Sequence, residues 1–214
     1  MPLTIIFLGK AGAGKGTQGH LLEQKFKTKV IGTGDLLRAF AKLGLPASGR
    51  IEKEVLLAGK LAPSWFVSYL WIFEVLHTLP AENTLFDGSP RMLPEALLID
   101  DVLDWNGRIP PKVFLLDISD AEATRRLLSR RVCEVCKKIY QGDSAEVKAG
   151  ACPCGGKLVK RHDDTPQAIE SRLAYFKTDV LPVVEHYEKK GWLIRINGEQ
   201  PAQKVHGDIL KYFL

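Results

Sequence analysis

The chain lacks the features that would mark a membrane or exported protein. No apolar run among its 214 residues reaches about 18 residues, the length that a membrane-spanning helix requires. No basic segment precedes the first apolar stretch and no small-residue cleavage site follows it, so we expect no signal peptide and a cytoplasmic location. There is also no internal repeat and no low-complexity tract. These absences predict a globular protein with no membrane partner.

Cysteine is scarce and confined to one segment. The four cysteines lie between residues 133 and 154, as Cys133-x-x-Cys136 followed by Cys152-x-Cys154. In the cytoplasm, paired cysteines indicate a metal site more often than disulfides, and two close pairs resemble a zinc ribbon with four thiolate ligands. The second pair has only one residue between its cysteines. Two alternatives therefore remain: a former metal site that no longer binds metal, or a redox-active cysteine pair. His162 could also replace one cysteine.

The composition favours a folded protein with an anionic ligand. Hydrophobic residues make up 45% of the chain, and the formal net charge is +5. A chain of this length can bury a good core as one domain with insertions. A basic balance suits either nucleotides or nucleic acid. Because no basic run is interleaved with aromatic residues, we expect no nucleic-acid partner.

A glycine-rich segment carries the most chemical information. Residues 9–17 read GKAGAGKGT, after an apolar run and before a helical pattern. This order is the layout of a phosphate-binding P-loop, although Gly16 separates the lysine from the threonine. Backbone N–H groups and a helix N-terminus converge there on a polyphosphate, Lys15 reaches the β- and γ-phosphates, and Thr17 helps hold Mg²⁺. The residues expected to bind ATP here are Gly12, Ala13, Gly14, Lys15, Gly16 and Thr17.

Short apolar runs alternate with helical patterns along the whole chain. This alternation predicts an α/β fold of three layers with a parallel sheet of about five strands. We expect the aromatic-rich stretch at residues 65–73 to pack in the core. The predicted strands are 3–8, 29–31, 84–86, 113–118 and 192–196. The predicted helices are 14–26, 34–42, 51–58, 64–79, 94–105, 121–131, 167–189 and 202–212.

Four further motifs make the prediction specific. They are TGDLLR at 33–38, DGSPR at 87–91, RRVC at 130–133 and RHDD at 161–164, followed by Arg172. Together with the P-loop, they resemble the adenylate kinase family in its form with a long, zinc-bearing lid. The resemblance implies a P-loop kinase fold with two inserts. Its core domain would be residues 1–31, 63–130 and 165–214, its AMP-binding arm 32–62 and its lid 131–164.

That resemblance implies reversible transfer of the γ-phosphoryl group of ATP to AMP, giving two ADP. Such chemistry needs alignment, charge neutralisation and exclusion of water. Arg126 is expected on the adenine of ATP, and Asp87 near Mg²⁺ through water. The implied catalytic residues are Lys15, Arg91, Arg130, Arg161 and Arg172, and Arg130 also binds ATP. The implied AMP-binding residues are Thr33, Arg38, Lys60, Leu61, Gly88, Arg91, Glu95, Arg161 and Arg172. We expect a monomer, with Asp163 and Asp164 either binding arginines or capping the next helix.

Two departures from the family pattern bear on the acceptor. Ser89 stands where the family usually has Phe, and Glu95 stands where it usually has Gln. A glutamine amide can both donate to and accept from adenine, whereas an ionised glutamate only accepts. A nucleoside monophosphate kinase with another acceptor base is therefore an alternative. A zinc-bearing, nucleic-acid-binding ATPase is a second alternative, from a different class.

Overall fold

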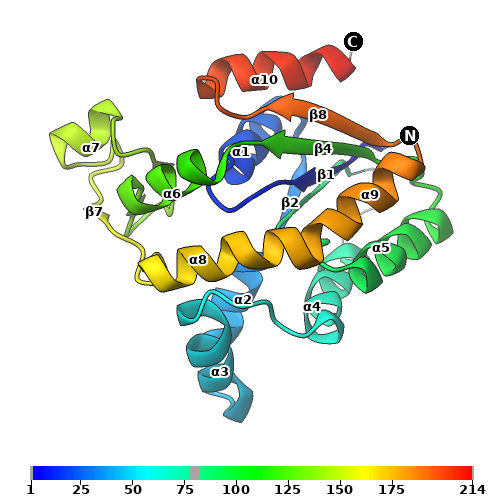
Figure 1. Cartoon of the computed structure of the whole chain (residues 1–214), viewed down its shortest axis with the longest axis horizontal. Helices are drawn as coiled ribbons and strands as arrows, with labels where there is room; N and C mark the ends of the chain where they lie inside the picture. Colours follow the sequence, from blue (N-terminus) through cyan, green and yellow to red (C-terminus); the bar gives the residue numbers. More distant parts are fainter. Residues whose placement is uncertain (1, 78–81, 214) are drawn as a thin grey trace.

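The computed structural model describes residues 2–77 and 82–213 and has an α/β architecture built on a parallel sheet (Figure 1). The five strands lie in the order β2-β3-β1-β4-β8, and all their pairings are parallel. The fold class predicted from the alternation is confirmed. The strands are β1 Thr4–Leu8, β2 Lys29–Gly32, β3 Thr84–Asp87, β4 Lys112–Asp117 and β8 Leu193–Asn197.

Helices cover both faces of this sheet, which explains why the strands read as continuous apolar runs. Successive side chains of β1 point to opposite faces: Ile6 and Leu8 join one core cluster, whereas Ile5 and Phe7 join the other. The first cluster is completed by α4, α5 and α9, and the second by α1 and α10. The helices named so far are α1 Lys15–Phe26, α4 Ser64–Leu76, α5 Leu93–Trp105, α9 Leu181–Lys189 and α10 Ala202–Leu210.

Several helix boundaries differ from the expected ones. The stretch predicted as one helix at 167–189 is α8 Pro166–Tyr175, the π-helical turn η2 Phe176–Val180 and then α9. The segment after α2 Thr33–Ala41 contains an unpredicted short helix, α3 Pro46–Arg50, which leads into the π-helical η1 Ile51–Leu57. Predicted helix 64–79 ends at Leu76, and its last two predicted residues lie outside the described residues.

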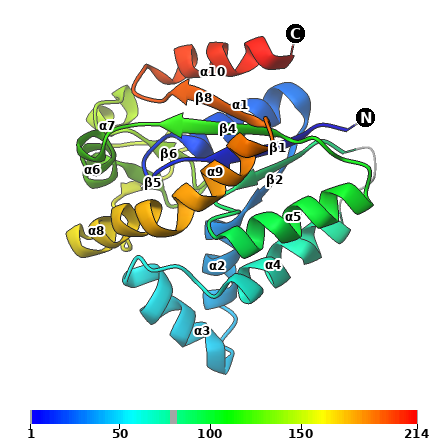
Figure 2. The same ribbon diagram turned by 45° about the vertical axis from the view of Figure 1, so that its right-hand side comes forward.

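The cysteine-rich segment forms a small unit of its own after α6 Asp120–Ser129. Its strands are β5 Arg131–Cys133, β6 Ile139–Tyr140 and β7 Leu158–Val159, in the antiparallel order β6-β5-β7, and it carries the helix α7 Ala145–Ala149. In both ribbon views this unit lies to the left, well away from α3 (Figures 1 and 2). Its apolar core is small: Cys133, Tyr140 and Cys152, with Val147 and Leu158 packed against them.

The prediction that residues 65–73 pack in the core is only half right. Phe66 and Trp71 are buried, but Trp65, Tyr69 and Phe73 are 71%, 62% and 55% exposed. Residues spaced by four share one helix face, and this face of α4 points to solvent. No helix in the described part of the chain is both long and apolar enough to cross a membrane.

Candidate active site

The P-loop connects β1 to α1 and depends on backbone geometry that only glycine adopts easily. Gly9, Gly12 and Gly14 have positive φ angles of 137°, 86° and 94°. A side chain at Gly9 would also be 2.5 Å from the Leu116 carbonyl oxygen in β4. The loop is therefore pressed against the sheet, and its free N–H groups at the start of α1 form an anion site.

Lys15 is held by the loop it belongs to. Its Nζ donates to the carbonyl oxygens of Gly9 and Lys10, at 2.7 and 2.8 Å. Burial lowers the pKa of this ammonium group to about 8; the Asp87 carboxylate opposes the shift, and the charge of Arg91 adds to it. The charge is thus confined beside the loop, where a bound phosphate would favour it.

Asp87 ends β3 directly opposite the start of α1. A side chain at Gly16 would lie 3.4 Å from its Oδ2 atom, so the carboxylate and the helix N-terminus share one space. Burial raises the pKa of Asp87, while the charges of Lys15 and Arg91 oppose the rise. A buried carboxylate beside a phosphate site suits a hydrated divalent cation, and Thr17, one residue beyond Gly16 on α1, can offer a hydroxyl.

Three of the predicted arginines converge on a pair of aspartates. Arg161 forms a two-pronged pair with Asp163, at 3.0 and 2.8 Å, and Arg130 does the same with Asp164. Arg172 bridges both carboxylates, at 3.1 Å to Asp163 and 2.9 Å to Asp164. Burial alone would raise the pKa of Asp163, but the hydrogen bond and charge of Arg161 and the charge of Arg172 outweigh it, so the pKa is lowered.

This cluster decides between the two expectations for the aspartates. Both aspartates bind arginines, and the cap of α8 is the neighbouring Thr165, whose hydroxyl accepts from the Ala168 N–H. Arg38 stands at the edge of the cluster, 2.6 Å from Asp35 and 3.9 Å from Asp163.

Arg91 and the P-loop line the same small cavity. The lining includes Gly9, Lys15, Gly88, Arg91 and Tyr175. The guanidinium of Arg91 donates to the Tyr175 hydroxyl at 3.0 Å. It also lies close over Gly88, where a side chain would be 3.1 Å from Nη2. The structure therefore brings Lys15 and Arg91 into the lining of one space.

Thr33, Ser89 and Glu95 form a buried group beside Arg91. The Thr33 hydroxyl donates to Ser89 Oγ at 2.8 Å, and the Arg91 backbone N–H donates to Glu95 Oε2 at 2.8 Å. Burial raises the pKa of Glu95, and the Arg91 N–H and charge oppose the rise.

Three predicted site residues do not join the cluster of arginines and aspartates. Arg126 donates to Glu122 of its own helix at 2.6 Å. Lys60 is exposed and Leu61 is half-buried, just after the end of η1. Gly59 packs so closely on α8 that a side chain there would be 2.5 Å from the Ala168 carbonyl oxygen. Lys60 and Leu61 are thus anchored near α8 through Gly59.

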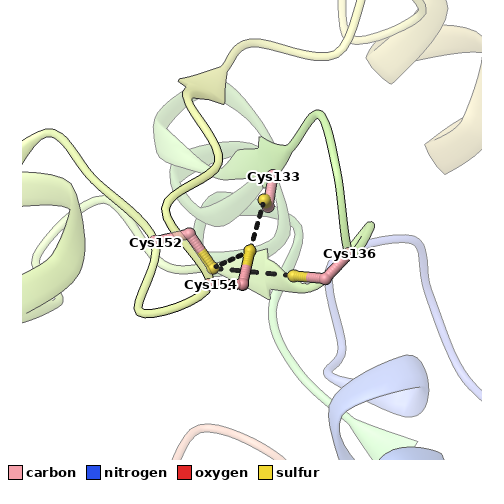
Figure 3. Close-up of side chains that lie close together, drawn as sticks. All are labelled: Cys133, Cys136, Cys152 and Cys154. Atoms are coloured by element: carbon pink, nitrogen blue, oxygen red, sulfur yellow. Dashed lines mark hydrogen bonds between the residues drawn. The ribbon is translucent and has the colours of Figure 1, made fainter.

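The four cysteine sulfurs come together in one cluster (Figure 3), all within 4.8 Å of one another. The short second pair is accommodated because its chain makes a turn, with the Gly155 N–H bonded to the Cys152 carbonyl oxygen at 2.8 Å. This turn brings the sulfurs of Cys152 and Cys154 to 3.3 Å. Thiolates bind zinc at about 2.3 Å in a tetrahedron, which places sulfurs roughly 3.7 Å apart, so the cluster fits that ion.

The surroundings of the cluster support thiolate character. The Tyr140 hydroxyl lies 3.0 Å from Cys152 Sγ, and this hydrogen bond lowers the pKa of Cys152 to about 6. A side chain at Gly156 would collide with Cys133 Sγ at 2.4 Å, so glycine is required there. His162 does not join the cluster; it pairs with Glu52 at 2.9 Å.

Sequence reasoning missed two residues of the site. Tyr175 contacts Arg91, and its position three residues after Arg172 on α8 was the available signal, since such residues share a helix face. Lys10 donates to the Ile118 carbonyl oxygen at 2.6 Å and pairs with Asp120 at 2.9 Å, which ties the P-loop to the start of α6. A larger pocket of about 400 Å³ between α6 and α8 contains none of the predicted site residues.

Comparison with known proteins agrees with this geometry. A model of the family described as adenylate kinase matches residues 7–192. The adenylate kinase of Novosphingobium aromaticivorans is 37% identical over 201 residues, which cover 92% of each chain. That of Chlamydia pneumoniae is 35% identical over 208 residues, 96% of this chain and 95% of the relative. That of Methanothrix thermoacetophila is 32% identical over 210 residues, which cover 98% of this chain and 97% of the relative. The chain therefore belongs to the adenylate kinase family of phosphotransferases.

Proposed function

We propose that the chain transfers the γ-phosphoryl group of ATP to AMP, giving two ADP. The observation that carries the proposal is that Lys15 and Arg91 line the same small cavity. A donor phosphate on the P-loop and an acceptor phosphate on Arg91 would meet there. The bond between the β-phosphate bridging oxygen and the γ-phosphorus breaks, and an oxygen of the AMP phosphate forms the new bond to that phosphorus.

The chain's own residues would position and neutralise the phosphates. The loop N–H groups of Gly12, Ala13, Gly14 and Gly16, with Lys15 and Thr17, would hold the donor phosphates. Arg130, Arg161 and Arg172 would exchange their aspartate partners for phosphate oxygens, because guanidinium groups bind either anion through two hydrogen bonds. Arg126 would lie along the ATP base after release from Glu122. Preorganised charges of this kind stabilise the negative charge that builds up in transfer.

The acceptor would lie between the α2 end of the arm and Arg91. Arg38 and Arg91 would hold its phosphate, Gly88 would leave room for it, and Thr33, Lys60 and Leu61 would border its base. We place Glu95 at this acceptor site as well. The arm at 32–62 and the lid at 131–164 would move relative to the remaining core.

Two metals belong to the proposal. Mg²⁺, when bound with ATP, would neutralise phosphate charge, and Asp87 and Thr17 are the residues suited to hold it through water. Zn²⁺ would be structural, bound by Cys133, Cys136, Cys152 and Cys154. A monomer in the cytoplasm, acting without nucleic acid, completes the proposal; the ATPase alternative is not favoured by the family comparison.

A coupled assay tests the proposal. Purified protein with Mg-ATP and AMP, and without nucleic acid, should form ADP in a ratio of two per AMP consumed. The same assay with GMP, CMP and UMP tests the alternative of another acceptor base, which was raised because Glu95 stands where the family usually has Gln. ATP hydrolysis without an acceptor requirement would contradict both forms of the proposal.

A further inference from the structure

The acceptor side contains a chain of buried polar groups drawn from three parts of the sequence. Thr33 lies at the start of α2, Ser89 in the turn after β3, and Glu95 in the first turn of α5, and their exposed fractions are 2%, 0% and 1%. Thr33 Oγ1 donates to Ser89 Oγ at 2.8 Å, and Ser89 Oγ donates to Glu95 Oε2 at 3.4 Å. The arrangement gives each hydroxyl proton a defined acceptor.

The end of this chain is the backbone of Arg91. The Arg91 N–H donates to the same Oε2 atom of Glu95 at 2.8 Å. One carboxylate oxygen therefore receives two donors from within the protein. Burying a carboxylate costs free energy unless donors compensate it, and these donors supply that compensation.

Arg91 is consequently fixed at both ends. Its backbone is held by Glu95, and its guanidinium is held by the Tyr175 hydroxyl at 3.0 Å and lies 5.7 Å from the centre of the Tyr175 ring. Arg91 and Lys15 line one cavity, so a phosphate bound there would meet this guanidinium. A side chain held at both ends loses less conformational entropy when it binds phosphate.

We propose that Glu95 is a positioning residue for Arg91, held in place by Ser89 and Thr33, and does not itself read the acceptor base. The inference rests on the proposed phosphoryl transfer, since Arg91 is assigned there to the acceptor phosphate. It makes Ser89 a positioning residue as well.

This role also explains why the two departures from the family pattern occur together. A serine at 89 supplies a hydroxyl donor to the carboxylate, which phenylalanine cannot do. A glutamate at 95 offers acceptors at both carboxylate oxygens, whereas a glutamine replaces one of them by an N–H₂ group, which cannot accept from Ser89 or the Arg91 N–H. Each residue therefore suits the other.

Steady-state kinetics of Ser89→Ala, Glu95→Gln and the double variant test the inference. KM for the acceptor should rise roughly tenfold, the scale of losing one hydrogen bond to a charged group. The rise should be the same factor for AMP, GMP and CMP. Where a nucleotide is turned over too slowly, its inhibition constant Ki as a competitor of AMP replaces KM. KM for ATP should change less than about twofold. The double variant should show less than the product of the single effects, because the two residues act through one contact.

A buried carboxylate elsewhere supplies the control. Asp100 pairs with His186 at 2.7 Å and with Lys190 at 2.6 Å, between α5 and α9. Asp100→Asn should lower the melting temperature without raising the acceptor KM, which separates positioning from general loss of structure. If Glu95→Gln does not fold, Ser89→Ala, which removes one donor to the Glu95 carboxylate, carries the test alone.

The outcomes are distinguishable. If the factor by which KM rises differs between AMP, GMP and CMP, Glu95 reads the base and the inference is overturned. An unchanged acceptor KM in all variants would also overturn it. Absence of phosphoryl transfer in the wild-type protein would instead remove the proposed function, and the inference with it.

Discussion

At the residue scale, Lys15 shows how the site manages charge before nucleotide arrives. Its ammonium group has two loop carbonyl oxygens as acceptors, so the charge is retained inside the protein although burial disfavours it. A phosphate anion is a stronger partner than a carbonyl oxygen. Nucleotide binding should therefore draw Lys15 away from the loop and raise its pKa.

The pH dependence of catalysis should report this exchange. With a pKa of about 8 in the free protein, Lys15 is charged below that pH and loses its charge above it. Because kcat/KM reports groups of the free enzyme, kcat/KM for ATP should fall above pH 8 by up to about tenfold per pH unit, while kcat falls only at higher pH. Rate measurements from pH 6.5 to 9.5 test this.

The matched control is Lys15→Ala. Its activity should be lower by roughly 10² to 10³, the usual cost of removing one preorganised donor, and its residual kcat/KM should show no step near pH 8. A wild-type profile that stays level to pH 9.5 would contradict the assignment of Lys15.

The limits of sequence reasoning are clear at this scale. The P-loop and the arginine motifs could be predicted because each is a local pattern with a fixed chemical requirement. The partner of a side chain could not be predicted when it comes from a distant segment. Glu95 was recognised as unusual, yet its contacts with Ser89 and Arg91 depend on how the turn after β3 meets α5.

At the scale of elements, α4 carries two tryptophans with opposite environments. Trp71 is fully buried against Phe86, with ring centres 5.8 Å apart, whereas Trp65 is 71% exposed. Trp71→Ala should destabilise the protein by about 3–5 kcal/mol, since it leaves a large cavity. Trp65→Ala should cost about 0.5 kcal/mol, as for most surface positions. Urea denaturation of both variants measures the difference; equal costs would show that α4 packs through a different face.

The cysteine-rich unit should depend on its metal. Its apolar core is small, so zinc binding would supply much of its folding free energy. Chelation should lower the melting temperature by roughly 4–8 °C, corresponding to about 2 kcal/mol for a chain of this size, without abolishing phosphoryl transfer. Calorimetry, together with elemental analysis of protein purified without chelator, measures both quantities.

Cys133→Ser is the control for that experiment. The variant should already have the lower melting temperature, and chelator should change it no further. Protein that contains no zinc before chelation, or a chelation effect that persists in the variant, would rule out this role of the cluster.

The same unit shows which elements a sequence can predict. The parallel strands and long helices have enough periodic residues to be recognised. Strands of two or three residues, such as β6 and β7, carry no period of their own and form because the turns around the cysteines place them side by side. The π-helical turns η1 and η2 continue the helical pattern, so nothing in the apolar spacing separates them from α-helix.

At the scale of the whole molecule, residues of the proposed arm (32–62) and of the proposed lid (131–164) already contact each other. His162 of the lid pairs with Glu52 of the arm at 2.9 Å, and Arg38 of the arm lies 3.9 Å from Asp163 of the lid. Both His162 and Glu52 are exposed, so their contact is weak and can open. We nevertheless expect this contact to favour nucleotide-free conformations in which the two segments lie close together.

Solution scattering should detect closure and its bias. A bisubstrate analogue joining ATP and AMP should reduce the radius of gyration, because phosphates would draw the lid and arm arginines together. Glu52→Gln should expand the nucleotide-free protein slightly and leave the analogue-bound form unchanged. If the analogue binds and the radius of gyration does not fall, closure is excluded. If nucleotide-free Glu52→Gln has the same radius of gyration as the nucleotide-free wild-type protein, the His162–Glu52 contact does not favour approach of the two segments.

The two aspartates beneath the arginines have a consequence for turnover. Asp163 and Asp164 give Arg130, Arg161 and Arg172 anionic partners before any nucleotide is present. A phosphate that bound to these arginines would therefore gain only the free-energy difference between its own hydrogen bonds and those that it displaces. When the phosphate left, the arginines would pair again with Asp163 and Asp164 and would not remain as unpaired charges. The proposed site would thus favour exchange of phosphates over tight retention, and a reversible reaction needs products that leave as easily as substrates arrive.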